Sequence, residues 1–275
     1  MNTENCHRVE NALHSRRIVR SLKMRSGCFF VVMPVLPVCF YGGYMKFFKE
    51  FRKLTKFELT LWICSLIAVT ASFLLCPEKD YLSLSASLVG ATALIFLAKG
   101  LVIGQVLTVV FSLLYGVVSC IFGYYGEMIT YIFMSTPAAV FSIISWLRHP
   151  YADGDGEVEV RSRLTLRSML ALIAISSVVT ASFFFILRAL DTANLIFSTV
   201  SIFTSFFASG LTFLRSPYYA LAYCSNDIVL ILLWVLATVE NVAYLPMILC
   251  FVVFLINDLY GFVNWRRMQK AQSKA

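Results

Sequence analysis

The chain has 275 residues, of which 59% are hydrophobic and only 14% charged, and its mean hydropathy is +0.79. Soluble domains are nearer half apolar and a quarter charged, so this balance excludes an ordinary soluble domain and predicts an all-α polytopic membrane protein. The net charge of +8 does not indicate a nucleic-acid partner, because Lys and Arg in membrane proteins gather in cytoplasmic loops.

The first 44 residues fit the membrane pattern badly, and we expect 1–44 to be an N-terminal extension that is poorly ordered or not native. Its apolar stretch CFFVVMPVLPVCFYGGY, at 28–44, is short and contains two prolines. If that stretch spanned the membrane, the six basic residues before it would lie outside, against the positive-inside rule. The following MKFFKEFRKLTK predicts a basic interfacial segment at 45–56.

Eight apolar runs of about 20 residues follow, each long enough to cross a hydrocarbon core as a helix. A polar loop at 148–167 separates a first half of the bundle, 57–147, from a second half, 168–268, and 269–275 forms a tail. The predicted spans are 57–76, 81–98, 101–122, 128–147, 168–188, 192–214, 217–236 and 243–265.

The distribution of basic residues predicts the orientation of these spans. If the first span begins in the cytoplasm, fifteen Lys and Arg residues fall in inner segments, and only Lys79 and Arg188 fall outside. We therefore expect a multi-pass membrane protein with both ends of the bundle cytoplasmic.

The two halves resemble each other in pattern. LAKG…FSLLYG…ISWLRHP, at 97–150, matches TFLRSP…ILLW…VNWRRM, at 212–268. Each has a basic turn, a span, a short outer loop and a last span that closes on Trp and then Arg. Units of the same orientation form a parallel repeat, which is typical of transporters.

Polar residues recur at helical spacing inside four of the spans. The third has Gln105, Thr108, Ser112, Tyr115 and Ser119; the sixth has Asn194, Ser198, Ser201, Ser205 and Thr212; the seventh has Tyr219, Tyr223, Asn226 and Trp234 with Asp227 beside them; the eighth has Asn257 and Asn264 with Asp258 beside them. Ser and Thr often serve helix packing, but an Asp at a helix centre costs about 2.5–3.5 kcal/mol.

No Lys or Arg lies within the predicted spans near these two Asp residues, so we expect a solvated or ligand-facing cavity lined by ten candidate residues. They are Gln105, Tyr115, Tyr219, Tyr223, Asn226, Asp227, Trp234, Asn257, Asp258 and Asn264. Alternatively, the Asp residues accept hydrogen bonds from neighbours and hold the site together. Amides suit sugar hydroxyls, and Tyr and Trp faces stack flat rings and attract cations.

Other functions are poorly supported by the residue types. The eight cysteines form no CxxC motif and the three histidines lie outside the spans, so we expect no metal, no cofactor and no catalytic residue. A membrane enzyme would need such residues or a GxSxG motif. A receptor or scaffold would be expected to carry a larger soluble module than the loop at 148–167.

Three motifs carry a resemblance to a known family: GYYGEMITYIFMSTPAAVFSIISW at 123–146, NDIVLILLW at 226–234 and FLINDLYGFVNWRR at 254–267. With them the chain resembles the bacterial nicotinamide riboside transporter family, PnuC, over about 57–268. The resemblance implies two three-helix bundles, spans 2–4 and 6–8, joined by span 5 as a linker helix, with span 1 as an extra N-terminal helix.

The resemblance also implies a homotrimer that takes up nicotinamide riboside, a vitamin and NAD precursor, by facilitated diffusion, with trapping by a cytosolic kinase. Wider family members carry thiamine, riboflavin or deoxynucleosides, which are the alternative substrates. Asn226, Asn257 and Tyr115 fall on family motif positions. Many members have a WxxW stretch where this chain has Tyr219 and Tyr223, so the identity of the vitamin stays open.

Overall fold

The computed structural model describes residues 50–75, 81–122, 124–152, 156–161, 164–192, 194–240 and 242–274. The chain divides into two units, 1–52 and 53–275, and the description below concerns the second. The predicted extension at 1–44 and residues 45–49 of the predicted interfacial segment at 45–56 lie outside the described residues.

Eight helices long and apolar enough to cross a membrane are found among the described residues, which confirms the predicted number of spans. The fourth span consists of three consecutive pieces, and the described residues form no β-strand, only isolated bridges. The elements are α4 Lys56–Leu75, α5 Tyr81–Ala98, α6 Val102–Ile121, α7 Tyr125–Ile129, the π-helical η1 Thr130–Ser135, α8 Thr136–Leu147, α9 Leu166–Ala189, α10 Leu195–Phe213, α11 Tyr219–Glu240, the 3₁₀ turn η2 Val242–Tyr244 and α12 Leu245–Gln272.

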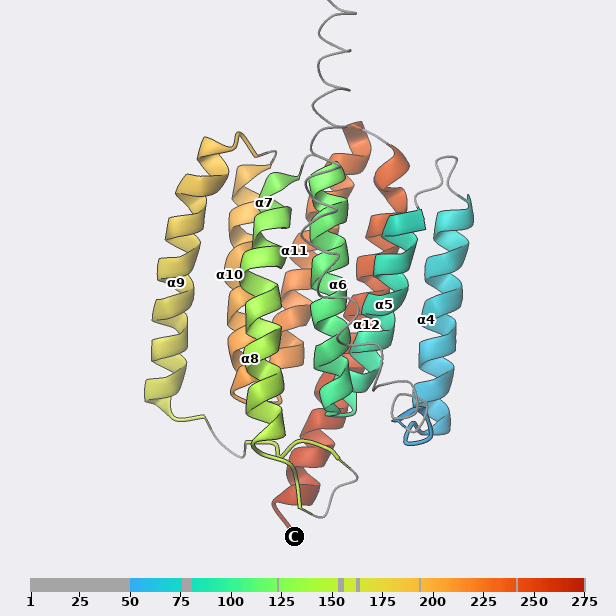
Figure 1. The fold of residues 1–275 in the computed structure, drawn as a ribbon, viewed down its shortest axis with the longest axis vertical. Coiled ribbons are helices and arrows are strands. Elements are labelled where there is room, and N and C mark those ends of the chain that lie inside the picture. The colour runs from blue at the N-terminus through green and yellow to red at the C-terminus, as the bar shows by residue number, and fades with distance from the viewer. Residues whose placement is uncertain are drawn as a thin grey trace, which may run out of the picture. The chain divides into compact units, whose positions relative to one another are not determined.

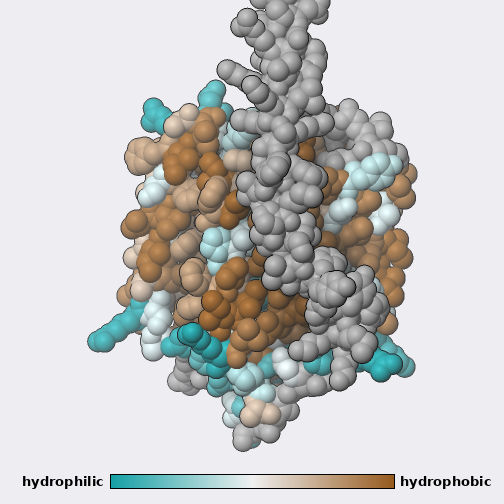
Figure 2. All heavy atoms as spheres, viewed as in Figure 1, coloured by the Kyte–Doolittle hydropathy of each residue, from teal (hydrophilic) through white to brown (hydrophobic). Residues whose placement is uncertain are grey.

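The helices stand side by side, and their outer surface is apolar. Figure 1 shows α9 at one edge of the row of helices and α4 at the other. Large side chains such as Ile67, Val178 and Ile228 are more than half exposed. On the face drawn in Figure 2, apolar side chains cover the middle and hydrophilic ones gather along the lower edge. This is the surface expected of a helical bundle in lipid.

Six of the helices form a closed ring. Contacts run from α5 to α6, then to α8, α10, α11 and α12, and from α12 back to α5. α4 packs outside the ring against α5 and α12, and α9 packs against α10. Exchanging α5 with α10, α6 with α11 and α8 with α12 reproduces the same ring, as the predicted parallel repeat requires. α9 is then the linker helix and α4 the extra helix.

The turn after the first helix has the same geometry in both three-helix bundles. Gly100 follows α5 with φ +73°, and Arg215 follows α10 with φ +56°. The Leu101 amide donates to the Phe96 carbonyl at 3.0 Å, and the Ser216 amide donates to the Leu211 carbonyl at 3.0 Å. Both are six-to-one bonds that end a helix on a left-handed residue. The repeat is therefore present in the backbone at matching positions.

One end of the bundle, which we call the basic end, carries Lys99, Arg148, Arg215 and Arg266 and is the lower end in Figure 1. The other end is called the far end. Residues 156–161, which we call the strap, lie at the basic end and hydrogen-bond both repeats. The Val158 amide donates to the Gly100 carbonyl, and the Arg161 amide donates to the Arg215 carbonyl, both at 3.0 Å.

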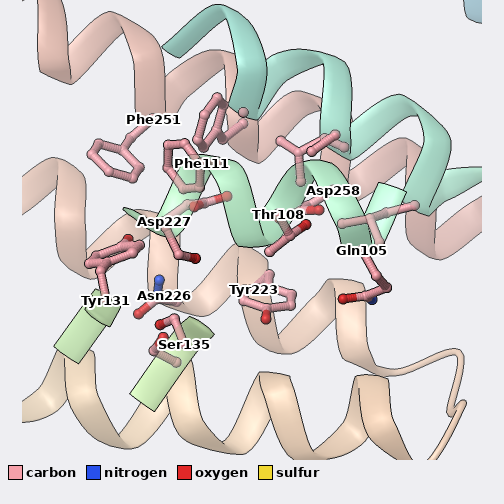
Figure 3. Close-up of a pocket in the computed structure, with 17 residues that line it drawn as sticks. Gln105, Thr108, Phe111, Tyr131, Ser135, Tyr223, Asn226, Asp227, Phe251 and Asp258 are labelled. Atoms are coloured by element: carbon pink, nitrogen blue, oxygen red, sulfur yellow. The ribbon is translucent and has the colours of Figure 1, made fainter. Parts of the chain in front are cut away.

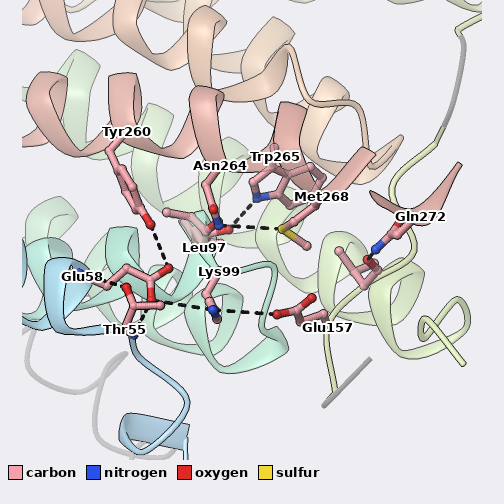
Figure 4. Close-up of polar contacts among 12 residues, drawn as sticks. Thr55, Glu58, Leu97, Lys99, Glu157, Tyr260, Asn264, Trp265, Met268 and Gln272 are labelled. Carbon is pink, nitrogen blue, oxygen red and sulfur yellow. Dashed lines mark hydrogen bonds and ion pairs between the residues drawn. The ribbon is translucent and has the colours of Figure 1, made fainter. Parts of the chain in front are cut away.

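The last turns of α12 also hold the strap, which explains why this helix reaches Gln272, beyond the predicted span end at 265. The Gln272 Oε1 accepts from the Val160 amide at 2.7 Å and its Nε2 donates to the Val158 carbonyl at 3.1 Å. Also at the basic end, Glu58 accepts hydrogen bonds from the Tyr260 hydroxyl at 2.8 Å and the Thr55 amide at 2.7 Å (Figure 4). Lys99 lies 3.6 Å from Glu58.

Candidate functional site

A cavity of about 70 Å³ lies inside the ring, and its wall is formed by α5, α6, α10, α11, α12 and η1, the segment that leads into α8. Its apolar lining includes Phe111, Phe251 and Phe254. Its polar lining consists of Gln105, Thr108, Ser112, Tyr131, Ser135, Ser205, Tyr223, Asn226, Asp227 and Asp258 (Figure 3). Typical ligand pockets hold about 300–1,000 Å³, so a guest with a ring and a sugar needs the walls to move apart.

Three polar atoms of the lining are buried without a hydrogen-bond partner in the described structure. They are Gln105 Nε2, Ser112 Oγ and Asp227 Oδ2, and their residues are at most 4% exposed. A buried polar atom without a partner costs about 1–3 kcal/mol, so such atoms need a reason. They supply a donor amide, a hydroxyl and a carboxylate oxygen to whatever occupies the cavity.

Asp227 on α11 and Asp258 on α12 are both 4% exposed and both line the cavity. Among the described residues, the lining contains no Lys, Arg or His. The charge of the wall therefore comes from carboxyl groups alone.

Neighbouring polar residues are held by bonds between helices. Thr204 of α10 donates to the Asn226 Oδ1 at 2.9 Å. The Tyr223 hydroxyl lies 3.0 Å from the Ser209 hydroxyl. These contacts tie α10 to α11 and fix the amide and phenol along the cavity wall, which leaves the Asn226 amide nitrogen as a potential donor.

The fourth span supplies two lining residues from its π-helical segment. Thr130–Ser135 forms η1, and Tyr131 and Ser135 face the cavity. Pro137 lies two residues after η1, and because proline has no N–H it interrupts the normal α-helical bonding. The Tyr131 carbonyl accepts both the Thr136 backbone N–H and the Thr136 hydroxyl, the hydroxyl at 2.9 Å. π-helical turns are frequent at functional sites.

Aromatic rings close the cavity at the far end. Trp234 is fully buried and its indole N–H donates to the Tyr115 hydroxyl at 3.0 Å. The Tyr115 ring lies 4.3 Å from that of Tyr131, and Trp234 packs against Tyr124 and Tyr244 at 5.1 and 5.6 Å between centroids. Tyr131 therefore belongs both to this cluster and to the cavity wall.

Two tryptophans close the basic end. The Trp146 indole donates to the Thr212 carbonyl at 3.0 Å, and the Trp265 indole donates to the Leu97 carbonyl at 2.8 Å. Each bond joins the last helix of one three-helix bundle to the first helix of the other. The two indole rings lie 5.4 Å apart, and Tyr219 packs on Trp265 at 4.7 Å.

Five of the ten predicted site residues come together in the cavity wall: Gln105, Tyr223, Asn226, Asp227 and Asp258. Tyr115 and Trp234 lie in the far-end cluster and Tyr219 in the basic-end cluster. Asn257 donates to the Ser65 hydroxyl of α4 at 2.9 Å, and Asn264 donates to the Ala98 carbonyl at 2.8 Å. For all ten, contact with a substrate stays a prediction.

Five polar lining residues were not among the ten predicted site residues. Thr108, Ser112 and Ser205 lie in the predicted polar stripes, whereas Tyr131 and Ser135 were missed altogether. Tyr131 and Ser135 are four residues apart and so share a helix face, and they lie six and two residues before Pro137. That spacing was the available signal. The sequence reasoning also missed the phenylalanines that line the cavity, because the sequence of an apolar span does not distinguish an apolar residue that faces a cavity from one that faces lipid.

Comparison with known proteins places these features in a family. The family model described as nicotinamide mononucleotide transporter matches residues 80–267. A nicotinamide riboside transporter PnuC from Neisseria mucosa is 28% identical over 80% of this chain and 84% of its own length. The corresponding protein from Haemophilus influenzae is 23% identical over 78% and 91%.

A solved crystal structure of a vitamin B3 transporter PnuC has the same fold, with a TM-score of 0.69 and 27% identity over 80% of this chain and 94% of that one. The match of the family model covers both halves of the repeat and every ring helix. The family is one of membrane transporters and not of enzymes. This eight-span chain therefore belongs to the nicotinamide mononucleotide transporter family, and the PnuC transporters are its relatives.

Proposed function

We propose that this protein carries nicotinamide riboside across the bacterial cell membrane for NAD biosynthesis. The observation that carries the proposal is a cavity in the middle of the ring whose wall holds unpartnered polar atoms on Gln105, Ser112 and Asp227. An amide and a sugar can satisfy such atoms, and the surrounding rings of Phe111 and Tyr131 offer faces to a flat heterocycle. The relatives from Neisseria mucosa and Haemophilus influenzae are both named nicotinamide riboside transporters.

The charge of the wall favours the riboside over the phosphorylated mononucleotide that gives the family model its name. A phosphate group is normally met by Arg, Lys or a cluster of backbone amides. The described lining has Asp227 and Asp258 and no basic side chain. A phosphate beside two carboxyl groups would meet like charge in a water-poor cavity.

The finer points follow the family resemblance. We propose a homotrimer, facilitated diffusion through alternate opening of the two ends, and trapping by a cytosolic kinase. The basic end, where α4 begins and α12 ends, faces the cytoplasm, which the basic residues near Lys99 and Arg266 support. Thiamine, riboflavin and deoxynucleosides are the alternative substrates for the same cavity.

The test is uptake of labelled nicotinamide riboside into vesicles that contain the purified full chain. We expect the label to equilibrate, unlabelled riboside to compete and the mononucleotide to compete poorly. Asn226→Leu should abolish binding, because the cavity loses an amide. Ser225→Leu, on the exposed side of the same helix, should bind normally. Absence of flux with the riboside and every alternative substrate would reject a transport function.

A parallel Asn257→Leu variant tests the sequence prediction for that residue. Loss of binding would support a role at the site. Normal affinity with a lowered unfolding free energy would limit Asn257 to the contact between α12 and Ser65 of α4.

A further inference from the structure

Corresponding positions of the two three-helix bundles carry different chemistry around the cavity. Gly90 on α5 lies ten residues before the left-handed residue Gly100. Ser205 on α10 lies ten residues before the left-handed residue Arg215. Both Gly90 and Ser205 line the cavity. The parallel repeat therefore places a glycine in one wall of the cavity at the position where the other bundle places a hydroxyl group.

Two more pairs of cavity residues show the same division. Phe111 on α6 and Asn226 on α11 each lie eleven residues after the left-handed residue of their bundle. Phe254 on α12 and Ser135 in η1 each lie eleven residues before the tryptophan that closes the basic end. The apolar members belong to the neighbouring helices α12, α5 and α6, and the polar members belong to η1, α10 and α11.

The cavity therefore has an apolar side centred on α5 and a polar side centred on α10. Figure 3 shows Phe111 across the cavity from Asn226 and Ser135. All residues that α5 contributes to the described lining are apolar: Gly90, Ala93, Leu94 and Leu97. Nicotinamide riboside has the same division, because a flat ring is joined to a sugar with several hydroxyl groups.

On the apolar side, two phenylalanine rings rest against the backbone of Gly90. A Cβ at this position would overlap the tip of the Phe254 ring and would lie 2.9 Å from the Phe111 Cδ2, whereas carbon atoms pack at about 3.5–4.0 Å. The two rings lie 5.5 Å apart between centroids, at 70°. Glycine is a poor residue for the middle of a helix and is used where the backbone is approached closely. The absence of a side chain on Gly90 therefore gives both rings their place.

We propose that Gly90, Phe111 and Phe254 form a seat for the flat ring of the substrate, which we call the ring seat, and that Gly90 sets its depth. This inference rests on the proposed function and adds to it an orientation for the substrate. The ring faces α5, α6 and α12. The sugar faces η1, α10 and α11, where hydroxyl and amide groups can donate to and accept from its hydroxyl groups.

The ring seat makes position 90 a determinant of affinity. Phe111 and Phe254 both line the cavity, so a methyl group on residue 90 displaces the two rings into the space that the substrate's ring needs. One added carbon in an apolar pocket changes recognition by about 10- to 200-fold. Gly90→Ala should therefore weaken the binding of nicotinamide riboside by an amount in this range.

The experiment is equilibrium binding of labelled nicotinamide riboside to the purified full chain, with the unfolding free energy measured on the same samples. Gly210→Ala is the matched control. It adds the same methyl group to α10, where a Cβ would overlap the side chain of Leu172 on α9, and Gly210 does not line the cavity. Gly210→Ala should bind the riboside with normal affinity, even if its stability falls.

A second substitution tests the contact itself. In the natural chain, Phe254→Leu removes one ring from the seat and should lower affinity by about 2- to 10-fold. In the Gly90→Ala chain, Phe254→Leu removes the ring tip that the added methyl group meets, so affinity should rise relative to Gly90→Ala alone. A role in packing alone would not reverse the direction of the effect.

The outcomes separate the ring seat from the proposed function. Equal affinity of Gly90→Ala and Gly210→Ala, or a fall with Phe254→Leu in both backgrounds, would overturn the ring seat and leave the proposed function intact. No binding by the natural chain would reject both. If Gly90→Ala does not fold, Phe111→Leu and Phe254→Leu decide, because they add no atoms. Both should bind more weakly than Phe262→Leu, a change on α12 outside the cavity lining, and affinity equal to that of Phe262→Leu would overturn the ring seat.

Discussion

At the basic end, the cavity is closed by the indole N–H groups of Trp146 and Trp265, which donate to backbone carbonyls of the opposite three-helix bundle. The strap adds backbone hydrogen bonds to the turns at Gly100 and Arg215. At the far end, rings pack around Trp234 and Tyr115, and the Trp234 indole donates to the Tyr115 hydroxyl. Directional bonds to a helix backbone fix position closely, whereas ring pairs contribute about 0.5–1.5 kcal/mol each and tolerate several arrangements.

This difference indicates which end of the bundle opens at the lower cost in free energy. Opening the basic end separates bonds that join the two halves and leaves buried groups unpaired, which costs about 1–3 kcal/mol for each. Opening the far end slides rings past one another. Because the cavity of about 70 Å³ is too small for a ring and a sugar, one end must open during transport, and we expect the far end to open more readily.

The largest effect is expected from truncating the tryptophans of the basic end. Trp146→Ala and Trp265→Ala should each lower the free energy of unfolding by about 3–5 kcal/mol, because both side chains are almost fully buried. Denaturant unfolding in detergent micelles measures this. Trp62→Ala is the control, since Trp62 on α4 is only half-buried and should cost less. A small loss for one of the two buried tryptophans would contradict their equivalence in the repeat.

A smaller effect is expected at the far end. Trp234→Phe keeps a ring and removes the bond to the Tyr115 hydroxyl, so stability should fall by about 1 kcal/mol. The rings should separate more often and expose Cys250, which belongs to the same buried cluster. Reaction of Cys250 with a charged, membrane-impermeant maleimide measures this opening.

The control for this labelling is a Trp234→Phe, Cys250→Ser double variant, which should remove the added signal. Trp265→Phe should leave the Cys250 labelling rate unchanged, because it loosens the other end. Equal acceleration by both single variants would mean that the two ends open together and not independently.

Much of the fold could be predicted from the sequence. Apolar length and the positions of Lys and Arg predict eight spans, and the pattern of Trp followed by Arg predicts the repeat, because lipid imposes these constraints on each segment alone. The π-helical turn at Thr130–Ser135 could not be read in this way. It depends on how the fourth span packs against its neighbours beside Pro137.

The site was predicted only in part. Helical spacing places Tyr223 and Asn226 on one face of α11, and both line the cavity in the structure. The same stripe leads along α11 to Trp234 at the far end and Tyr219 at the basic end. A polar stripe runs the length of a helix, whereas a cavity occupies a few turns. Which part of the stripe meets the cavity depends on the two closures, and these are made by residues from other helices.

A further effect is expected at the two turns that the strap holds at the basic end. Gly100 and Arg215 have the same left-handed conformation, which costs a residue with a Cβ about 1–2 kcal/mol. Gly100→Ala should therefore destabilise by about that amount, and more if the new Cβ, 2.8 Å from Met268 Cε, displaces this side chain.

Arg215→Gly should change stability little, because relief of the backbone offsets loss of the ion pair with Glu159, a partly exposed pair at 3.2 Å that contributes about 0–1 kcal/mol. Arg215→Ala, which keeps the strain and loses the pair, should be less stable than Arg215→Gly. The unfolding midpoints of the three variants rank these terms. If Arg215→Gly were as unstable as Gly100→Ala, the arginine side chain would hold its turn more strongly than the strap does, and closure of the basic end would depend on charge as well as on backbone bonds.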